Sequence, residues 1–142
     1  MNGKVFELII ETCLFREKIT PMFLQAKVTF VPNVDFDVIC FTEEQYPIAI
    51  SLKTSLRERY KQADLEAIAL KYVHRNAKNY LIMLKLDETA SLKQKLKKGE
   101  LLGINEVIAA DDVEFDEFVD NMKKNKYINP GKVDIITGNL VK

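Results

Sequence analysis

The chain has 142 residues, with 21 basic and 21 acidic residues and a formal net charge of zero. This length fits one domain, spanning residues 1–142, with a single buried core. The zero net charge argues neither for nor against nucleic-acid binding, because what matters is how charge is distributed. No segment approaches the ~20 apolar residues of a membrane span, and the first residues lack the pattern of a secretion signal.

Two cysteines, Cys13 and Cys40, lie inside apolar runs and lack the spacing of metal ligands. We therefore expect reduced cysteines in the core rather than a disulfide or a zinc site. A cytoplasmic protein with no membrane partner is the corresponding prediction.

The first third of the chain shows one helical pattern followed by three strand patterns. Apolar spacing predicts a helix over 4–15. Short β-branched and aromatic runs predict strands over 28–31, 36–41 and 48–54. The polar loop 42–47 suits a hairpin connection between the last two strands.

The rest of the chain alternates helices and strands. Ser55 and Glu58 match a capping box that opens a helix running to about residue 75. Asp111 and Asp112 can cap a later helix. The elements expected after the first long helix are a strand over 80–86, a helix over 91–98, a strand over 106–110, a helix over 113–124 and an edge strand over 133–137.

The order of these elements is a meander of strands that leads into alternating strands and helices. Such an order predicts an α/β protein with three layers, in which helices flank a central mixed β-sheet.

Ionisable residues fall at informative places in the stretch 36–67. Alternation along a strand places Ala49, Ser51 and Lys53 on one face. The hairpin can then bring Asp37 beside Ser51 and Lys53. An ordinary surface ion pair explains a carboxylate and an ammonium in this arrangement equally well.

Glu66 adds a second carboxylate from the helix that follows. On a wheel of about 100° per residue, Glu66 lies in the middle of an apolar arc. The arc contains Leu65, Ala69, Leu70, Tyr72 and Val73, whereas Asp64, Lys71 and Arg75 form the solvated face. A buried carboxylate is costly unless it is paired or bound to a metal ion. A structural salt bridge to Lys53 is therefore one explanation, and a metal site shared with Asp37 is the other.

These residues resemble the PD-(D/E)XK restriction-endonuclease-like superfamily. The run KTSLRERYKQADLE is similar to a segment found in type II restriction endonucleases. In one branch of that family, serine replaces the acid two residues before the lysine, and a glutamate from the following helix becomes the metal ligand. Ser51 and Glu66 resemble these two positions. The family's Pro-Asp pair is missing here, and Asp35, on the same strand face as Asp37, is a rival ligand.

The resemblance implies a restriction-endonuclease-like core and a Mg²⁺- or Mn²⁺-dependent DNA endonuclease, of the kind used in restriction-modification systems. Two carboxylates suit Mg²⁺, and a nearby lysine can orient or deprotonate the attacking water. The expected catalytic residues are Asp37, Ser51, Lys53 and Glu66, with Asp37 and Glu66 as metal ligands. The residues expected to contact DNA are Arg57, Arg59, Lys61 and Gln62.

Two other interpretations stay open at this point. The chain could keep the nuclease fold as an inactive DNA-binding or interaction module, or its acidic and basic residues could form a buried ion network in a plain α/β domain. If it is a nuclease, cutting both strands of duplex DNA favours a homodimer, because two strands call for two sites.

Overall fold

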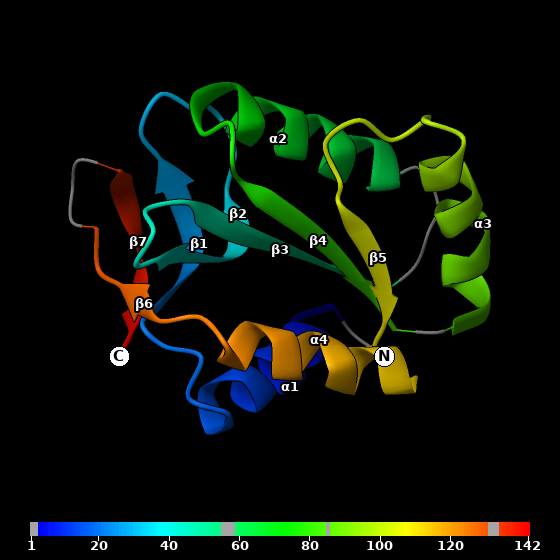
Figure 1. Ribbon diagram of the computed structural model, residues 1–142, viewed down its shortest axis with the longest axis horizontal. Helices are drawn as coiled ribbons and strands as arrows, with labels where there is room; N and C mark the ends of the chain where they lie inside the picture. Colours follow the sequence, from blue (N-terminus) through cyan, green and yellow to red (C-terminus); the bar gives the residue numbers. More distant parts are fainter. Residues whose placement is uncertain (1–2, 55–58, 85, 131–133) are drawn as a thin grey trace.

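The computed structural model describes residues 3–54, 59–84, 86–130 and 134–142. Figure 1 shows one twisted sheet between two layers of helices, with α1 and α4 on one face and α2 on the other. The helix α3 lies beside α2 and packs with it against β4 and β5. The helices are α1 (Gly3–Arg16), α2 (Arg59–Val73), α3 (Leu86–Lys97) and α4 (Val113–Lys123). This arrangement confirms the predicted three-layer α/β class.

In the described part of the chain, the sheet has seven strands and changes from antiparallel to parallel at β3. The strands are β1 (Met22–Val28), β2 (Phe36–Thr42), β3 (Pro47–Lys53), β4 (Lys78–Met83), β5 (Glu106–Ala109), β6 (Tyr127–Ile128) and β7 (Ile135–Val141). Their order is β5-β4-β3-β2-β1-β7, and β6 pairs with β2. A hairpin suffices for the antiparallel pair β2–β3, whereas the parallel pair β3–β4 needs a crossover, which α2 supplies.

The two faces of β3 enter different parts of the core. Ile48, Ile50 and Leu52 pack with α1 and α4, and Ala49 packs on the side of α2. This is the alternation predicted from the sequence. It places Ser51 and Lys53 on the α2 side of the strand.

The strand predicted over 28–31 is wrong, because β1 covers Met22–Val28 and residues 29–30 form a turn. Two irregularities of β1 explain why the sequence pattern did not indicate this strand. Gln25 has a positive φ of 49° inside the strand, and the burial pattern on its two sides does not alternate cleanly. Phe30, which looks like a strand residue, lies in the turn with 83% of its surface exposed.

The start of α3 also differs from the prediction. The helix begins at Leu86, earlier than the predicted residue 91, and β4 correspondingly ends at Met83. Asp111, from the segment before α4, accepts the backbone N–H of Leu86 at 2.9 Å. Asp112 occupies the N-cap of α4 without a side-chain capping bond. The predicted capping box at Ser55 and Glu58 lies outside the described residues.

The other elements agree with the sequence-based boundaries to within a few residues. The predicted edge strand is β7, which lies at the edge of the sheet beside β1 and continues to Val141. Cys40 is buried in the core, and Cys13 packs against the same core cluster. Both are free thiols. Within the described ranges, no helix has the length and apolar character needed to cross a bilayer.

Candidate active site

Asp37 lies where β2 and β3 separate. The paired residues of these strands reach Val38 and Ile50, and Asp37 is the next residue of β2. Its Oδ2 accepts the backbone N–H of Leu52 at 2.9 Å. The carboxylate thus takes the place of a backbone acceptor at this point, which fixes its orientation. We call this place, formed by Asp37, Ser51, Leu52 and Lys53, the fork.

Within the fork, Lys53 is the last residue of β3 and is half-buried. Burial raises the pKa of two carboxyl groups from opposite layers, Glu66 on α2 and Glu7 on α1, and the positive charge of Lys53 opposes this rise in both. The lysine is therefore electrostatically coupled to both helices at the open end of the hairpin. Ser51, two residues earlier on the same strand face, is also half-buried.

Glu66 is half-buried, and burial is the main cause that raises the pKa of its carboxyl group. Lys53 lowers this pKa, while Asp37 and Asp35 raise it. Among the described residues, none forms a hydrogen bond or an ion pair within 4.0 Å with Glu66. The direct Glu66–Lys53 salt bridge considered above is consequently not formed, and the charges interact over a longer distance.

The helical wheel placed the buried face of α2 wrongly. The buried face is centred on Ala63, Ala67 and Leu70. Leu65 and Tyr72, expected in the apolar arc, are 66% and 89% exposed. Glu66 therefore lies at the edge of the buried face rather than in its middle.

Asp64, expected on the solvated face, is instead buried. Its carboxylate accepts the backbone N–H groups of Leu102, Gly103 and Ile104 at 3.2, 2.8 and 3.1 Å. These partners are distant in sequence. They explain why the polarity of α2 residues alone predicted the wrong buried face for this helix.

Asp35, the rival ligand, precedes β2 and is exposed. It forms an ion pair with Lys27 at 2.9 Å. Asp37 is the acid that the fork holds by a backbone hydrogen bond, so it is the better placed of the two.

Three residues near the fork escaped the sequence analysis. Gln25 on β1 donates from Nε2 to Asp37 Oδ1 and to Glu7 Oε2, both at 3.4 Å. The pKa of Glu7 is raised first by burial and then by Asp37, and Glu11 shows the same direction for similar reasons. The only signal in the sequence is that Glu7 and Glu11 are four residues apart, on one side of the predicted first helix.

The residues expected to contact DNA lie at the start of α2. Lys61 and Gln62 are exposed there. Arg59 begins the helix, but its side chain lies outside the described part, as does the whole of Arg57. Two of the four expected positions are thus accessible to a ligand.

The donors available for a divalent cation are carboxylate oxygens. Within the described ranges there is no group of three or more acidic, histidine or cysteine side chains that could hold a metal ion. Mg²⁺ does not require such a group, since it is commonly bound by one or two carboxylates together with waters and phosphate oxygens. Asp37 and Glu66 fit this donor set by their chemistry.

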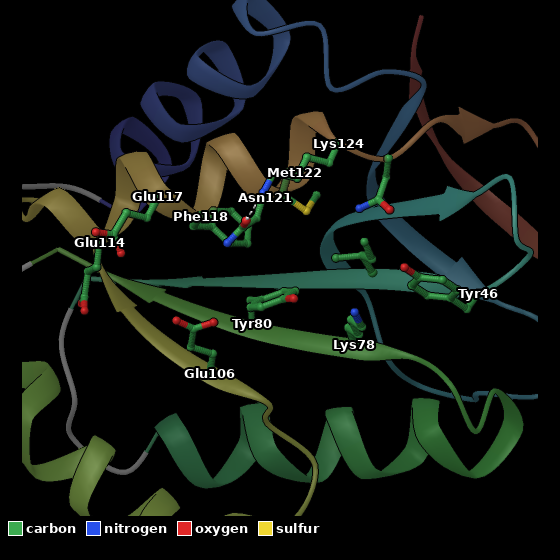
Figure 2. A pocket seen from close by; sticks show the side chains of 12 residues that line it. Tyr46, Lys78, Tyr80, Glu106, Glu114, Glu117, Phe118, Asn121, Met122 and Lys124 are labelled. Carbon is green, nitrogen blue, oxygen red and sulfur yellow. Dashed lines mark hydrogen bonds between the residues drawn. The ribbon is translucent and has the colours of Figure 1, made fainter.

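A separate pocket of about 370 Å³ lies between α4 and the starts of β3, β4 and β5. Figure 2 shows its aromatic side chains Tyr46, Tyr80 and Phe118 with charged groups of both signs around them. The pocket touches β3 at Ile48, five residues or roughly 17 Å along an extended strand from Lys53. It includes none of the predicted site residues, so this pocket and the fork are separate places on the sheet.

The chain was compared with protein-family models, with curated proteins and with solved structures, and none of them matches.

Proposed function

We propose that this protein is a Mg²⁺-dependent DNA endonuclease related to the PD-(D/E)XK enzymes. The observation that carries the proposal is the fork. There, a backbone hydrogen bond holds Asp37, and both Asp37 and Lys53 lie within electrostatic reach of Glu66. The central mixed sheet with helices on both faces is compatible with a restriction-endonuclease-like core.

In this proposal Asp37 and Glu66 hold the cation, and Ser51 stands where other members of the family carry an acid. The cation, Mg²⁺ or Mn²⁺, would polarise the scissile phosphoryl oxygen and make an attacking water more acidic. Lys53 orients that water and offsets the negative charge that develops on the phosphate. The half-buried environment of Lys53 and Glu66 strengthens such charge interactions relative to bulk water.

The DNA backbone would run along the beginning of α2. Lys61 and Gln62 are exposed there, and Arg57 and Arg59 precede them in the sequence. Such residues contact phosphates and position the duplex without reading its sequence. A homodimer acting on both strands, in a cytoplasmic restriction-modification system, completes the proposal.

The decisive experiment is cleavage of supercoiled plasmid with Mg²⁺, with Mn²⁺ and with EDTA. We expect cleavage only with a divalent ion, and a loss of about 10²–10⁴-fold in rate in Lys53→Ala, the range for removing a positioned proton-transfer group. Asp37→Asn and Glu66→Gln should also lose cleavage.

Asp35→Asn is the matched control. It removes a neighbouring carboxylate that is exposed and paired with Lys27, so it should retain cleavage. Cleavage that is metal-independent or survives Lys53→Ala would contradict the proposal. Retardation of DNA in a gel without any cleavage would instead favour the inactive DNA-binding module.

A further inference from the structure

The backbone of β1 is irregular at Gln25. Its φ of 49° lies in the left-handed region, which is unfavourable for residues other than glycine. Pairing with β2 is regular on both sides, through Leu24–Val38 and Ala26–Phe36. Pairing with β7 shifts register between Leu24 and Lys27. A β-bulge of this kind can redirect a side chain that would otherwise follow the regular alternation.

Gln25 is the one such residue that lies within a strand in the described part of the chain. The other non-glycine residues with positive φ lie in turns or bends; they are Lys18, Phe30, Asn33 and Gln45. Gln25 is also exposed, so burial in the core does not explain it. Positive φ is usually adopted by glycine or asparagine in turns, whereas Gln25 is a glutamine within a strand. Strained backbone of this kind is often retained where the side chain has a task.

The side chain of Gln25 joins two carboxylates. Its amide Nε2 lies 3.4 Å from both Asp37 Oδ1 and Glu7 Oε2. An amide group has two N–H donors, so one group can serve both acids at once. The regular β1–β2 register also sets Gln25 opposite Asp37 across the strand pair. The contact therefore arises from neighbouring backbone positions and does not depend on a long, flexible reach.

These contacts determine how Asp37 is held. Leu52 N–H donates to Oδ2 and Gln25 donates to Oδ1. Both oxygens are thus fixed, which sets the plane of the carboxylate. The same amide places a partial positive charge between Asp37 and Glu7, and this reduces the repulsion between the two acids.

We propose that Gln25 is a positioning residue that fixes the Asp37 carboxylate and links it to Glu7 on α1. Its consequence for metal binding rests on the proposed nuclease function, since Gln25 acts on the cation only through Asp37. Hydrogen-bond partners of metal ligands typically contribute 10–100-fold to metal affinity or activity.

The test compares Gln25→Gly, Gln25→Ala and the control Lys27→Ala. The glycine variant removes the amide and also suits the left-handed backbone, so it should melt at the same or a higher temperature than the parent protein. The alanine variant removes the amide but keeps the strain. Lys27 lies two residues along the same strand and pairs with Asp35 instead of Asp37.

Two measurements are needed on each protein. The first is the set of carboxyl ¹³C NMR signals in the metal-free protein, where the signals of Asp37 and Glu7 should both move in Gln25→Gly and Gln25→Ala but not in Lys27→Ala. The second is Mn²⁺ binding by calorimetry, where both Gln25 variants should bind about tenfold more weakly.

The outcomes separate the two proposals. Unchanged carboxyl signals and unchanged Mn²⁺ affinity in both Gln25 variants would overturn the role of Gln25 and leave the nuclease proposal standing. If the parent protein neither binds Mn²⁺ nor cuts DNA while the Asp37 and Glu7 signals still move, the nuclease proposal fails. The link made by Gln25 then stands. A Gly variant that weakens Mn²⁺ binding without losing thermal stability supports both.

Discussion

Two carboxylates on α2, Asp64 and Glu66, lie two residues apart and have opposite environments. Asp64 is 8% exposed, and three backbone N–H groups donate to it. Glu66 is half-buried, and the described part of the chain gives it no hydrogen bond. Burial of a charged group is tolerated when its hydrogen bonds are satisfied and is costly when they are not. Asp64 therefore has a structural task, whereas the hydrogen bonds of the described residues give Glu66 none.

The environment of Asp64 differs from that of Glu66 because the segment 101–104 supplies the hydrogen-bond donors of Asp64. This segment lies directly against α2 beside Asp64, and a Cβ added at Gly103 would come within 2.5 Å of Ile68 N and 2.7 Å of Ala67 Cβ. Only glycine allows this close approach. Glu66 makes no such contact with this segment; the charges that affect its pKa, after burial, are those of Lys53, Asp37 and Asp35.

The largest effect on stability should follow Asp64→Ala. It leaves three backbone N–H groups without an acceptor, and we expect a loss of about 3 kcal/mol in the free energy of unfolding, measured by urea denaturation. Asp64→Asn keeps one side-chain oxygen and should cost less. A loss below about 1 kcal/mol for Asp64→Ala would mean that these hydrogen bonds do not hold the segment on the helix.

Gly103→Ala tests the same contact between the segment 101–104 and α2, through a change in the segment instead of in the helix. The added methyl group must push the segment away from α2, at an expected cost of about 2 kcal/mol. Gly3→Ala is the control, because a Cβ at Gly3 would meet nothing within 4 Å. Equal thermal stability of the two variants would contradict the close packing at Gly103.

Glu66→Gln should have the smallest effect on stability and a large effect on cleavage. The substitution keeps the size of the side chain and removes a charge that burial disfavours. We expect an unfolding free energy equal to or slightly above that of the parent at neutral pH, together with lost DNA cleavage. A destabilisation as large as that of Asp64→Ala would place Glu66 among the structural carboxylates.

The pH dependence of stability further tests the contrast between Asp64 and Glu66. The pKa of Glu66 is raised in the folded protein, mainly by burial, so the native state holds this proton more tightly than the unfolded chain does. The contribution of protonated Glu66 to stability is full below the pKa of this residue in the unfolded chain. It is lost as pH rises through the pKa in the folded protein. The parent should therefore lose stability relative to Glu66→Gln over this interval, as measured by denaturation at a series of pH values.

Cleavage should change in the opposite direction over the same range. Under the proposed function the ionised carboxylate of Glu66 holds the cation, so the rate of DNA cleavage should fall as pH drops through the raised pKa of Glu66. An unchanged rate through that interval would indicate that Glu66 does not hold the cation.

Local patterns predicted the hairpin of β2 and β3, and with it the place of Asp37 beside the end of β3, because period-two alternation and a short loop are sufficient to specify both. The buried face of α2 could not be predicted in this way. The partners of Asp64 are 38–40 residues away in sequence, and no local rule identifies them. Gln25 and Glu7 were missed for the same reason, since a bulge and the packing of α1 bring them to the fork.

The change from antiparallel to parallel pairing at β3 has a consequence for folding order. The antiparallel pairs β1–β2 and β2–β3 join neighbouring segments, so little chain entropy is lost in closing them. The parallel pair β3–β4 must wait for the α2 crossover, and contacts over longer sequence separation form more slowly. We therefore expect Asp37 and Lys53 to come together early, while Glu66 joins them only when α2 docks. A chain arrested at the meander would contain Asp37 and Lys53 without Glu66, and under the proposed function it could not cut DNA.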